Sequence, residues 1–145
     1  MAAYARAKGG INDAPTGEVD WRPITLTGER VRVREDASAR GGARRYVAAV
    51  RDRATGELAG YTQVFVSPDS VRGEQGGTTV LRPYRGRGFG LWLKADMVRW
   101  LAEVEPHVVE YQTWNAAENA HMIAINERLG YRAVDTWQAW QLALG

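Results

Sequence analysis

The stretch Arg85-Gly86-Arg87-Gly88-Phe89-Gly90 decides which fold this sequence can adopt. It follows a β-branched, apolar run, Thr78-Thr79-Val80-Leu81, and precedes a segment from Leu91 to Leu101 whose apolar residues repeat at helical spacing. The sequence therefore predicts a strand, a glycine turn and a helix in direct succession. Such a turn leaves backbone N–H groups without partners at the positive end of a helix, which favours binding of an anion such as phosphate.

The predicted helix has one apolar face, formed by Leu93, Met97, Trp100, Leu101 and Val104. The polar residues between them, Lys94 among them, are expected to point away from that face. In the turn, three glycines allow close approach of a bulky anion, and Arg85 and Arg87 add positive charge. A solvated basic loop is the alternative interpretation of the two arginines.

Composition bounds the kind of protein. The chain has 145 residues, 45% hydrophobic and 25% charged, which is typical of one globular domain. Its net charge of +2 gives no reason to expect a nucleic acid partner, and we expect a cytoplasmic protein without membrane segments. The absence of cysteine excludes disulfides and thiolate nucleophiles. With His107 and His121 as the only histidines, we expect no metal site.

Around the glycine turn the sequence predicts a mixed α/β sheet. Strands are predicted over 45–51, 58–66, 75–81 and 108–114, and two short ones over 131–134 and 137–144. A helix capped by Thr27 is predicted over 29–40, and another is predicted to be capped by Asn115 and to end at Gly130. We expect residues 1–20 to be poorly structured and residues 21–145 to form the domain.

From Val47 onward, this order of elements and motifs resembles the GNAT superfamily of acyl-CoA-dependent N-acetyltransferases. The family motif Gln/Arg-x-x-Gly-x-Gly/Ala is matched by Arg85, Gly88 and Gly90. Asn115-Ala116-Ala117-Glu118-Asn119 and Asn126-Glu127-Arg128-Leu129-Gly130-Tyr131 are similar to the family's second conserved helix and its Leu-Gly-Phe/Tyr turn. Trp114-Asn115 and Gly90-Leu91-Trp92-Leu93-Lys94 look most like the C-terminal halves of tandem actinobacterial members.

The resemblance implies an α/β (α+β) fold, with a mostly antiparallel sheet flanked by helices, and acetyl-CoA as co-substrate. The amides that would hold the CoA pyrophosphate are those of Gly86, Arg87, Gly88, Phe89, Gly90 and Leu91. The outer strand edge that would pair with the pantetheine arm lies at Thr79, Val80 and Leu81. A splayed gap before the strand 108–114 would admit the arm, and Asn119 would contact it from the other side. An amide near Thr78 could polarise the thioester carbonyl.

The implied reaction is N-acetylation of a small amine. We expect direct transfer in a ternary complex, because no cysteine can carry the acetyl group. Glu74 precedes Arg85 by eleven residues, the offset at which some family members place a catalytic glutamate, although it could also be a solvated charge at the start of a strand. Tyr61, Trp114 and Asn115 are candidates for lining the acceptor pocket, and core packing is the alternative for the aromatic residues.

Two features depart from the family pattern. Asn126 occupies the position where many members have a tyrosine that protonates the departing thiolate, so that proton would have to come from Tyr131, Tyr84 or water, or the step would lack a donor. No clear first strand precedes Trp21, so either residues 19–26 replace it or the sheet edge is open. An open edge invites a homodimer or another GNAT-like domain. A catalytically degenerate acyl-CoA-binding module of the same fold is therefore the alternative function.

Two other glycine-rich motifs fit less well. Arg87-Gly88-Phe89-Gly90 is similar to the start of the RNA-binding RRM motif, but that motif needs aromatic residues alternating along a strand, and here the periodicity is helical. The spacing of Gly86, Gly88 and Gly90 also differs from the Gly-x-Gly-x-x-Gly of dinucleotide-binding folds.

Overall fold

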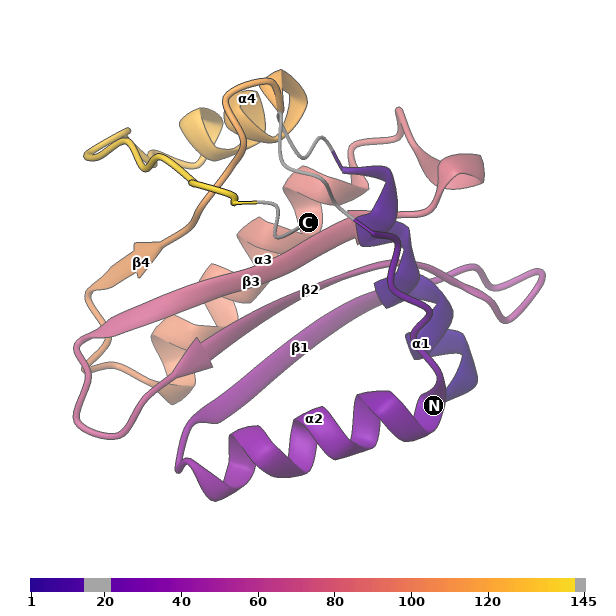
Figure 1. Ribbon diagram of the computed structural model, residues 1–145, viewed down its shortest axis with the longest axis horizontal. Helices are drawn as coiled ribbons and strands as arrows, with labels where there is room; N and C mark the ends of the chain where they lie inside the picture. Colours follow the sequence, from indigo (N-terminus) through magenta and orange to yellow (C-terminus); the bar gives the residue numbers. More distant parts are fainter. Residues whose placement is uncertain (15–21, 143–145) are drawn as a thin grey trace.

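A computed structural model, which describes residues 1–14 and 22–142, contains a four-stranded sheet of order β1-β2-β3-β4 (Figure 1). The strands are β1 (Arg44–Arg51), β2 (Leu58–Val66), β3 (Arg72–Val80) and β4 (Glu110–Gln112). β2 is antiparallel to both β1 and β3, whereas β4 is parallel to β3. The fold is thus the expected mixed α/β architecture with a mostly antiparallel, open sheet.

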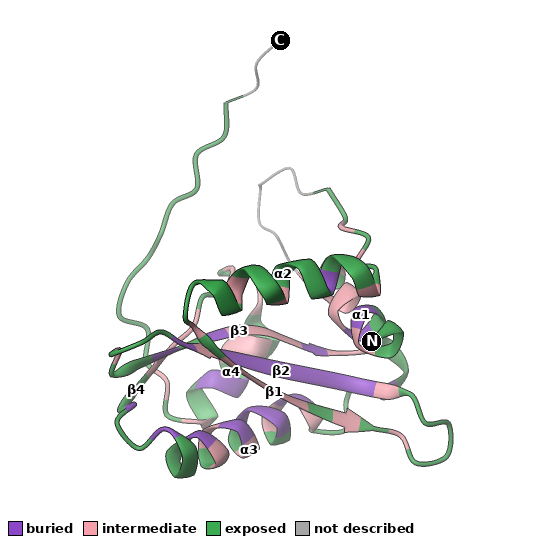
Figure 2. Ribbon diagram, turned by 90° about the horizontal axis from the view of Figure 1, so that it is seen from below, coloured by how far each residue is buried: buried purple, intermediate pink, exposed green. Residues whose placement is uncertain are grey.

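Helices cover both faces of this sheet. They are α1 (Ala2–Gly9), the 3₁₀ turn η1 (Gly10–Asp13), α2 (Gly28–Arg40), the 3₁₀ turn η2 (Arg82–Tyr84), α3 (Phe89–Val104) and α4 (Ala120–Arg128). Figure 2 shows α1 and α2 on one side of the sheet and α3 and α4 on the other. We refer to these sides as the α1 face and the α3 face.

A cluster of buried hydrophobic residues lies on the α3 face. Val64 and Val66 alternate along β2 onto this face, and Met97 and Leu101 are one helical turn apart on α3, so that each pair presents a common apolar surface. Val108 completes the buried cluster, and the rings of Tyr46 and Trp100 extend it with an edge-on contact at 5.2 Å between centroids. The predicted helix after the glycine turn is therefore the main cover of the sheet.

Local signals correctly predicted two helix ends. The hydroxyl of Thr27 accepts a hydrogen bond from the Arg30 amide at 3.2 Å, and α2 begins at the next residue, Gly28. At the end of α4, the Tyr131 amide donates to the Asn126 carbonyl, and the Gly130 amide donates to the Glu127 carbonyl. This pair of bonds, with Gly130 at φ 87°, is a Schellman motif.

The start of α4 differs from the prediction. The helix begins at Ala120, and its cap is Asn119, whose Oδ1 accepts a hydrogen bond from the Met122 amide at 3.3 Å. The prediction that Asn115 caps this helix is therefore wrong. Both residues are asparagines with equal intrinsic capping ability, so the sequence alone does not say which of them ends the preceding turn.

The N-terminal residues are more ordered than we predicted. Residues 2–13 form α1 and η1, because Ala5 and Ala7 are small enough for α1 to pack closely, at 3% and 0% exposure, and the Tyr4 ring contacts the Tyr61 ring of β2 edge-on at 5.4 Å. The prediction of a poorly structured segment is wrong for these residues. The proposed domain boundary at residue 20 lies outside the described residues.

The two predicted C-terminal strands are not found in the described part of that segment, residues 131–142. Val134, Trp137 and Trp140 are largely exposed there. Their β propensity does not suffice, because a strand is stabilised by a neighbouring strand to which it can bond, and here the segment makes no ladder with β4.

The far edge of the sheet is open within the described residues. β1 bonds to β2 on one side, and no strand among residues 1–14 and 22–142 pairs with its other side. Residues 22–26, part of the segment considered as a replacement for the first strand, form no strand, and residues 19–21 lie outside the described residues. No described helix is long and apolar enough to cross a membrane.

Candidate functional site

β3 carries a bulge and then loses its neighbour on one side. Thr62 of β2 pairs with Thr78, but Val64 pairs with Gln75, so β3 has one more residue than β2 in this interval, at Gly76 and Gly77. On the other side, pairing with β4 ends at Glu74 opposite Gln112. Beyond that point, residues 75–80 of β3 have an edge without a strand partner in the described structure, and this edge leads to the glycine turn.

The backbone groups on that edge can be assigned from the ladder. The Leu81 amide donates to the Ala59 carbonyl at 2.9 Å, so Leu81 and, two residues earlier, Thr79 direct their backbone groups at β2. Thr78 and Val80 then direct theirs at the open edge. The Val80 carbonyl already accepts a hydrogen bond from Arg85 Nε at 2.9 Å, which leaves the Val80 amide and both backbone groups of Thr78 for a ligand.

The glycine turn presents a set of backbone donors. The first helical bond of α3 runs from the Trp92 amide to the Gly88 carbonyl, and within the described residues the amides of 86–91 donate no hydrogen bond. Gly86 and Gly88 have φ values of 77° and 78°, a left-handed conformation that favours glycine. These amides lie at the positive end of a sixteen-residue helix, so the turn is suited to an anion.

Gly90 allows α3, α4 and β3 to pack closely next to the glycine turn. A Cβ atom there would lie 3.1 Å from Ile125 Cδ1 of α4 and 4.0 Å from Val80 Cγ2 of β3. Glycine at this position therefore brings the first turn of α3 against both the open strand edge and α4.

The two arginines of the turn have different environments. Arg85 is held by the Val80 carbonyl and by Asp13 of η1, at 2.9 Å from Nη2 to Oδ2, and Arg82 binds the same carboxylate. Hydrogen bonds from Arg82 and Arg85 lower the pKa of Asp13 below its usual value. Arg87 is exposed, with its guanidinium 5.8 Å from the centroid of the Tyr84 ring. Arg87 is thus the turn arginine better placed to meet a ligand from solvent.

Lys94 is buried, contrary to the sequence prediction. Its residue exposure is 1%, its Nζ donates to Asn126 Oδ1 at 2.5 Å, and its ammonium lies 4.9 Å from the centroid of the Tyr131 ring. Burial lowers the pKa of Lys94 to about 8. The sequence did contain a signal, because Gly90, Lys94, Met97 and Leu101 follow one another at helical spacing along the buried stripe of α3.

Glu74 lies where the gap between β3 and β4 opens. It is exposed and stands opposite Phe65 of β2, so the two side chains share a face. That is the α1 face, because Phe65 and Gln63 lie against Gly76 on the side where α1 contacts Gln63. Glu74 and Lys94 therefore belong to opposite faces of the sheet.

The other predicted site residues are dispersed. Tyr61 is 2% exposed beneath α1, and burial raises its pKa to about 12. Trp114 and Asn115 are exposed after β4, and the Trp114 ring contacts the Trp137 ring at 4.6 Å. Asn119 uses its Oδ1 to cap α4, which leaves its amide group directed elsewhere. The structure does not bring these residues together into one enclosed cavity.

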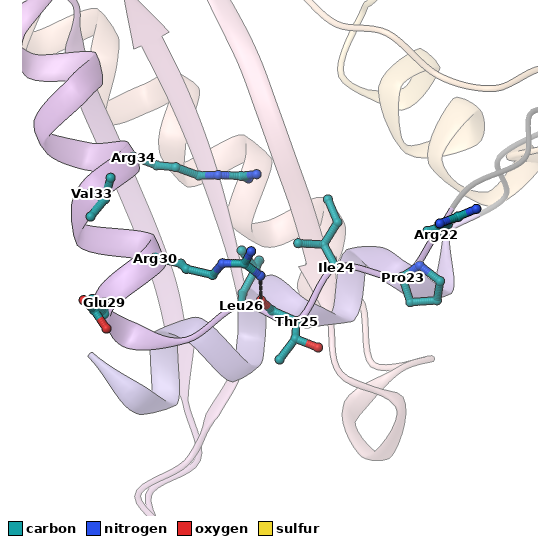
Figure 3. A pocket seen from close by; sticks show the side chains of 9 residues that line it. All are labelled: Arg22, Pro23, Ile24, Thr25, Leu26, Glu29, Arg30, Val33 and Arg34. Carbon is teal, nitrogen blue, oxygen red and sulfur yellow. Dashed lines mark hydrogen bonds between the residues drawn. The ribbon is translucent and has the colours of Figure 1, made fainter. Parts of the chain in front are cut away.

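A pocket of about 830 Å³ opens elsewhere, between the segment 22–26 and the outer side of α2 (Figure 3). It is lined by Arg22, Pro23, Ile24, Thr25, Leu26, Glu29, Arg30, Val33 and Arg34. None of these residues belongs to the predicted site. Among the described residues, no group of three or more His, Asp or Glu side chains could hold a metal ion.

Comparison with known proteins identifies the family of this chain. Residues 16–131 match the model of the acetyltransferase (GNAT) family. The solved tandem GNAT protein from the clavulanic acid biosynthesis pathway is 36% identical over 70% of this chain, with a TM-score of 0.68. This chain covers 32% of that protein, about a third of its length. No curated protein sequence matches.

More distant structures share the fold over nearly the whole chain. An acetyltransferase from Trypanosoma brucei is 18% identical in sequence and has a TM-score of 0.71. The match covers 98% of this chain and 92% of the Trypanosoma brucei chain. Glucosamine-6-phosphate N-acetyltransferase from Arabidopsis thaliana is 14% identical in sequence and has a TM-score of 0.63. The match covers 99% of this chain and 95% of the Arabidopsis chain. At these identities the likeness concerns the fold.

Proposed function

This chain belongs to the acetyltransferase (GNAT) family, and from that membership we propose that it transfers the acetyl group of acetyl-CoA to the amine of a small molecule. The observation that carries the proposal is the open edge of β3 between residues 75 and 80, which runs from the bulge to the unpartnered amides of the glycine turn. Such a strand edge can bind an extended arm through backbone hydrogen bonds. Such a turn can bind a diphosphate through its amides.

The residues present fit acetyl-CoA in this way. The amides of Gly86 to Leu91 would hold its pyrophosphate, with Arg87 adding charge, and the outward backbone groups of Thr78 and Val80 would bond to its pantetheine arm. When bound, acetyl-CoA supplies an acetyl group activated as a thioester. The Thr78 amide would stabilise charge on the carbonyl oxygen, and Asn119 would offer its remaining amide donor to the arm.

Glu74 is the proposed base. Its carboxylate, exposed at the opening of the gap, would accept the proton of the attacking amine directly or through water. The proposal includes direct transfer in a ternary complex, supported by the absence of a cysteine that could carry the acetyl group. Tyr61, Trp114 and Asn115 remain candidates for contacts with the acceptor. Turnover is measured as thiol release from acetyl-CoA with a panel of amines, and we expect Glu74→Gln to lower kcat while acetyl-CoA still binds.

The cofactor part of the proposal is tested by calorimetry with acetyl-CoA. Gly88→Ala places a side chain at φ 78° in the turn and should weaken binding at least tenfold, because the amides lose their common orientation. Gly56→Ala is the matched control, since Gly56 has φ 73° in the β1–β2 turn and, like Gly88, has no neighbouring atom within 4 Å of the position that a Cβ would occupy. Absence of binding by the unaltered chain would refute the proposal.

A catalytically degenerate acyl-CoA-binding partner module is the second candidate, and Asn126 is the observation that favours it. In that case the chain would bind acetyl-CoA without releasing thiol with any amine. The open edge of β1 would then pair with a second copy or with another GNAT-like domain, an arrangement in keeping with the tandem relative. Sedimentation of the chain alone and with acetyl-CoA tests the homodimer.

A further inference from the structure

A buried polar cluster lies where α3 meets α4. Lys94 of α3 is enclosed by Asn126 of α4 and by Tyr131, which the Schellman motif holds directly after α4. From β4, Tyr111 lies close enough to raise the pKa of Tyr131. Among the described residues, no carboxylate influences Lys94, so its ammonium is buried without a counter-ion.

The sheet side of the cluster is polar as well. Gln75 Nε2 donates to Thr62 Oγ1 at 2.9 Å and to the Gln63 carbonyl at 2.8 Å, and the hydroxyls of Thr62 and Thr78 are 2.7 Å apart. Several buried polar atoms here have no partner in the described structure: Gln75 Oε1, Tyr111 OH and Tyr131 OH. Buried polar atoms are normally bonded, so these three atoms retain hydrogen-bonding capacity that a ligand could use.

Lys94 lies level with the bulge of β3. Gly90 is against Val80, and α3 then runs back along the sheet, since Leu101 packs with Val66 at the far end. One helical turn from Gly90 to Lys94 covers about 6 Å, which corresponds to about two residues of a strand. By this count, Lys94 lies at about the level of Thr78, whose outward backbone groups line the open edge.

Building on the proposed function, we propose that Lys94 is the acid of the reaction: its Nζ ammonium gives a proton to the CoA sulfur as the acetyl group leaves. The amine lone pair forms the new C–N bond, the C–S bond breaks, and its electron pair goes to sulfur. Lys94 Nζ–H protonates that sulfur, which yields the thiol and a neutral lysine. The substrate nitrogen loses its proton to Glu74 or water, and solvent reprotonates Lys94 after product release.

Proton affinities favour Lys94 over its neighbours. An ordinary thiol has a pKa of about 8.5, and the pKa of Lys94 is lowered to about 8, so the transfer is nearly balanced. Burial raises the pKa of Tyr131 to about 12, which makes it a much weaker donor. Tyr84 is bound to Asp52, at 3.1 Å between hydroxyl and carboxylate. Asn126 has no proton to give, but its Oδ1 orients the Lys94 ammonium, so it is a positioning residue.

The absence of cysteine makes a chemical test possible. Lys94→Cys provides the chain with one thiol, which can be alkylated in denaturant with 2-bromoethylamine and refolded, so that an amino group returns to the end of a side chain of nearly lysine length. Alkylation with 1-bromopropane is the matched control of similar volume without the amine. We expect kcat to fall about 10²-fold with the propyl side chain and to recover with the aminoethyl one. Equal kcat for the two products would overturn the proposal.

A second readout does not depend on turnover. Lys8 and Lys94 are the only lysines, so lysine labelled at Cε gives two NMR signals, and Lys8→Met assigns them. We expect the Lys94 signal to titrate near pH 8, and its pKa to rise when CoA binds but not when desulfo-CoA binds, because only CoA brings a thiolate to the ammonium. Identical titrations with the two ligands would refute the proposal even if acetyl-CoA binds and is turned over.

The pH profile separates this proposal from the proposed function. If Lys94 is the acid, kcat declines above about pH 8 in the unaltered chain and in Lys8→Met, and this alkaline limb is absent in Lys94→Met, which should still bind acetyl-CoA. If acetyl-CoA does not bind to the unaltered chain, the proposed function fails. If it binds and Lys94→Met retains kcat with an unchanged alkaline limb, only the assignment of Lys94 fails.

Discussion

The two faces of the sheet carry the same kind of lysine site and give it different properties. On the α1 face, Lys8 Nζ donates to Gln63 Oε1 at 3.0 Å and lies 5.2 Å from the centroid of the Tyr4 ring. On the α3 face, Lys94 donates to Asn126 Oδ1 and lies over the Tyr131 ring. An amide oxygen and a tyrosine ring accompany both lysines, so these contacts do not distinguish them.

Water and neighbouring charges do distinguish them. Lys8 is partly exposed, and Glu35 of α2 partly offsets the effects of burial and of Arg45 and Arg34 on its pKa. For Lys94 the cause of the lowered pKa is burial alone. The comparison teaches that proton affinity follows from solvent access more than from the immediate hydrogen bond. The faces also differ in what they bury, since the α3 face carries an aliphatic cluster together with Lys94, whereas the α1 face buries Ala5, Ala7 and Tyr61.

The largest expected difference between the faces concerns stability. Leu101→Ala removes a fully buried side chain from the core on the α3 face and should lower the free energy of unfolding by about 2–5 kcal/mol. Val33→Ala, at an exposed position on α2, should change it by less than about 0.5 kcal/mol. Chemical denaturation of the two variants measures both values. Similar losses would mean that the Val33 side chain is packed against other residues and is not exposed.

The next effect is the pH dependence of stability. Folding lowers the pKa of Lys94 from 10.5 to about 8, so between these values the unfolded chain binds more protons, and stability must rise with pH. Burying the charged Lys94 ammonium lowers the free energy of unfolding by its full amount below pH 8, and this loss disappears toward pH 10.5. At 1.36 kcal/mol per pKa unit, the full loss is about 3 kcal/mol.

Denaturation between pH 7 and pH 10 therefore separates the two lysines. Lys94→Met should be more stable than the unaltered chain at pH 7, and its stability should increase little between pH 7 and pH 10. Lys8→Met should show the same increase in stability with pH as the unaltered chain. A Lys94→Met curve parallel to that of the unaltered chain would show that the Lys94 ammonium is hydrated, and the contrast between the faces would then disappear.

The features of the fold and of the candidate site that could be predicted from the sequence are those determined by neighbouring residues in the chain. β2 was predicted over its full length, and the cap at Thr27 and the glycine at 130 were found because each needs only its own neighbours. The glycine turn was predicted for the same reason, since left-handed glycines before a helix leave amides unpaired whatever surrounds them.

The remainder depended on distant partners. Lys94 was assigned to the polar surface by residue type, although its spacing from Gly90 and Met97 already put it on the buried stripe. The predicted strands after Gly130 would have needed an adjacent strand to bond to, and the order of α1 depends on packing of Ala5 and Ala7 against the sheet. No local pattern in the sequence encodes these tertiary contacts.

The smallest expected effect is electrostatic and connects the two faces. Asp13 of η1, on the α1 face, bonds to Arg82 and Arg85 at the glycine turn and so masks positive charge beside the proposed pyrophosphate site. Because these bonds lower the pKa of Asp13, its stabilising contribution is present above the usual carboxyl pKa and is lost as the pH falls through the lowered value. At neutral pH the carboxylate is charged and opposes an anionic ligand.

Asp13→Asn should therefore tighten acetyl-CoA binding by about two- to fivefold at low ionic strength, with the gain screened away in high salt. Calorimetry at two salt concentrations measures this, and Asp96→Asn, which removes an exposed carboxylate paired with Arg99 further along α3, is the matched control. Weaker binding in Asp13→Asn would show instead that Asp13 orients Arg85 for the ligand. In that case the α1 face would help to build the turn, because it would supply a residue on which the geometry of the turn depends.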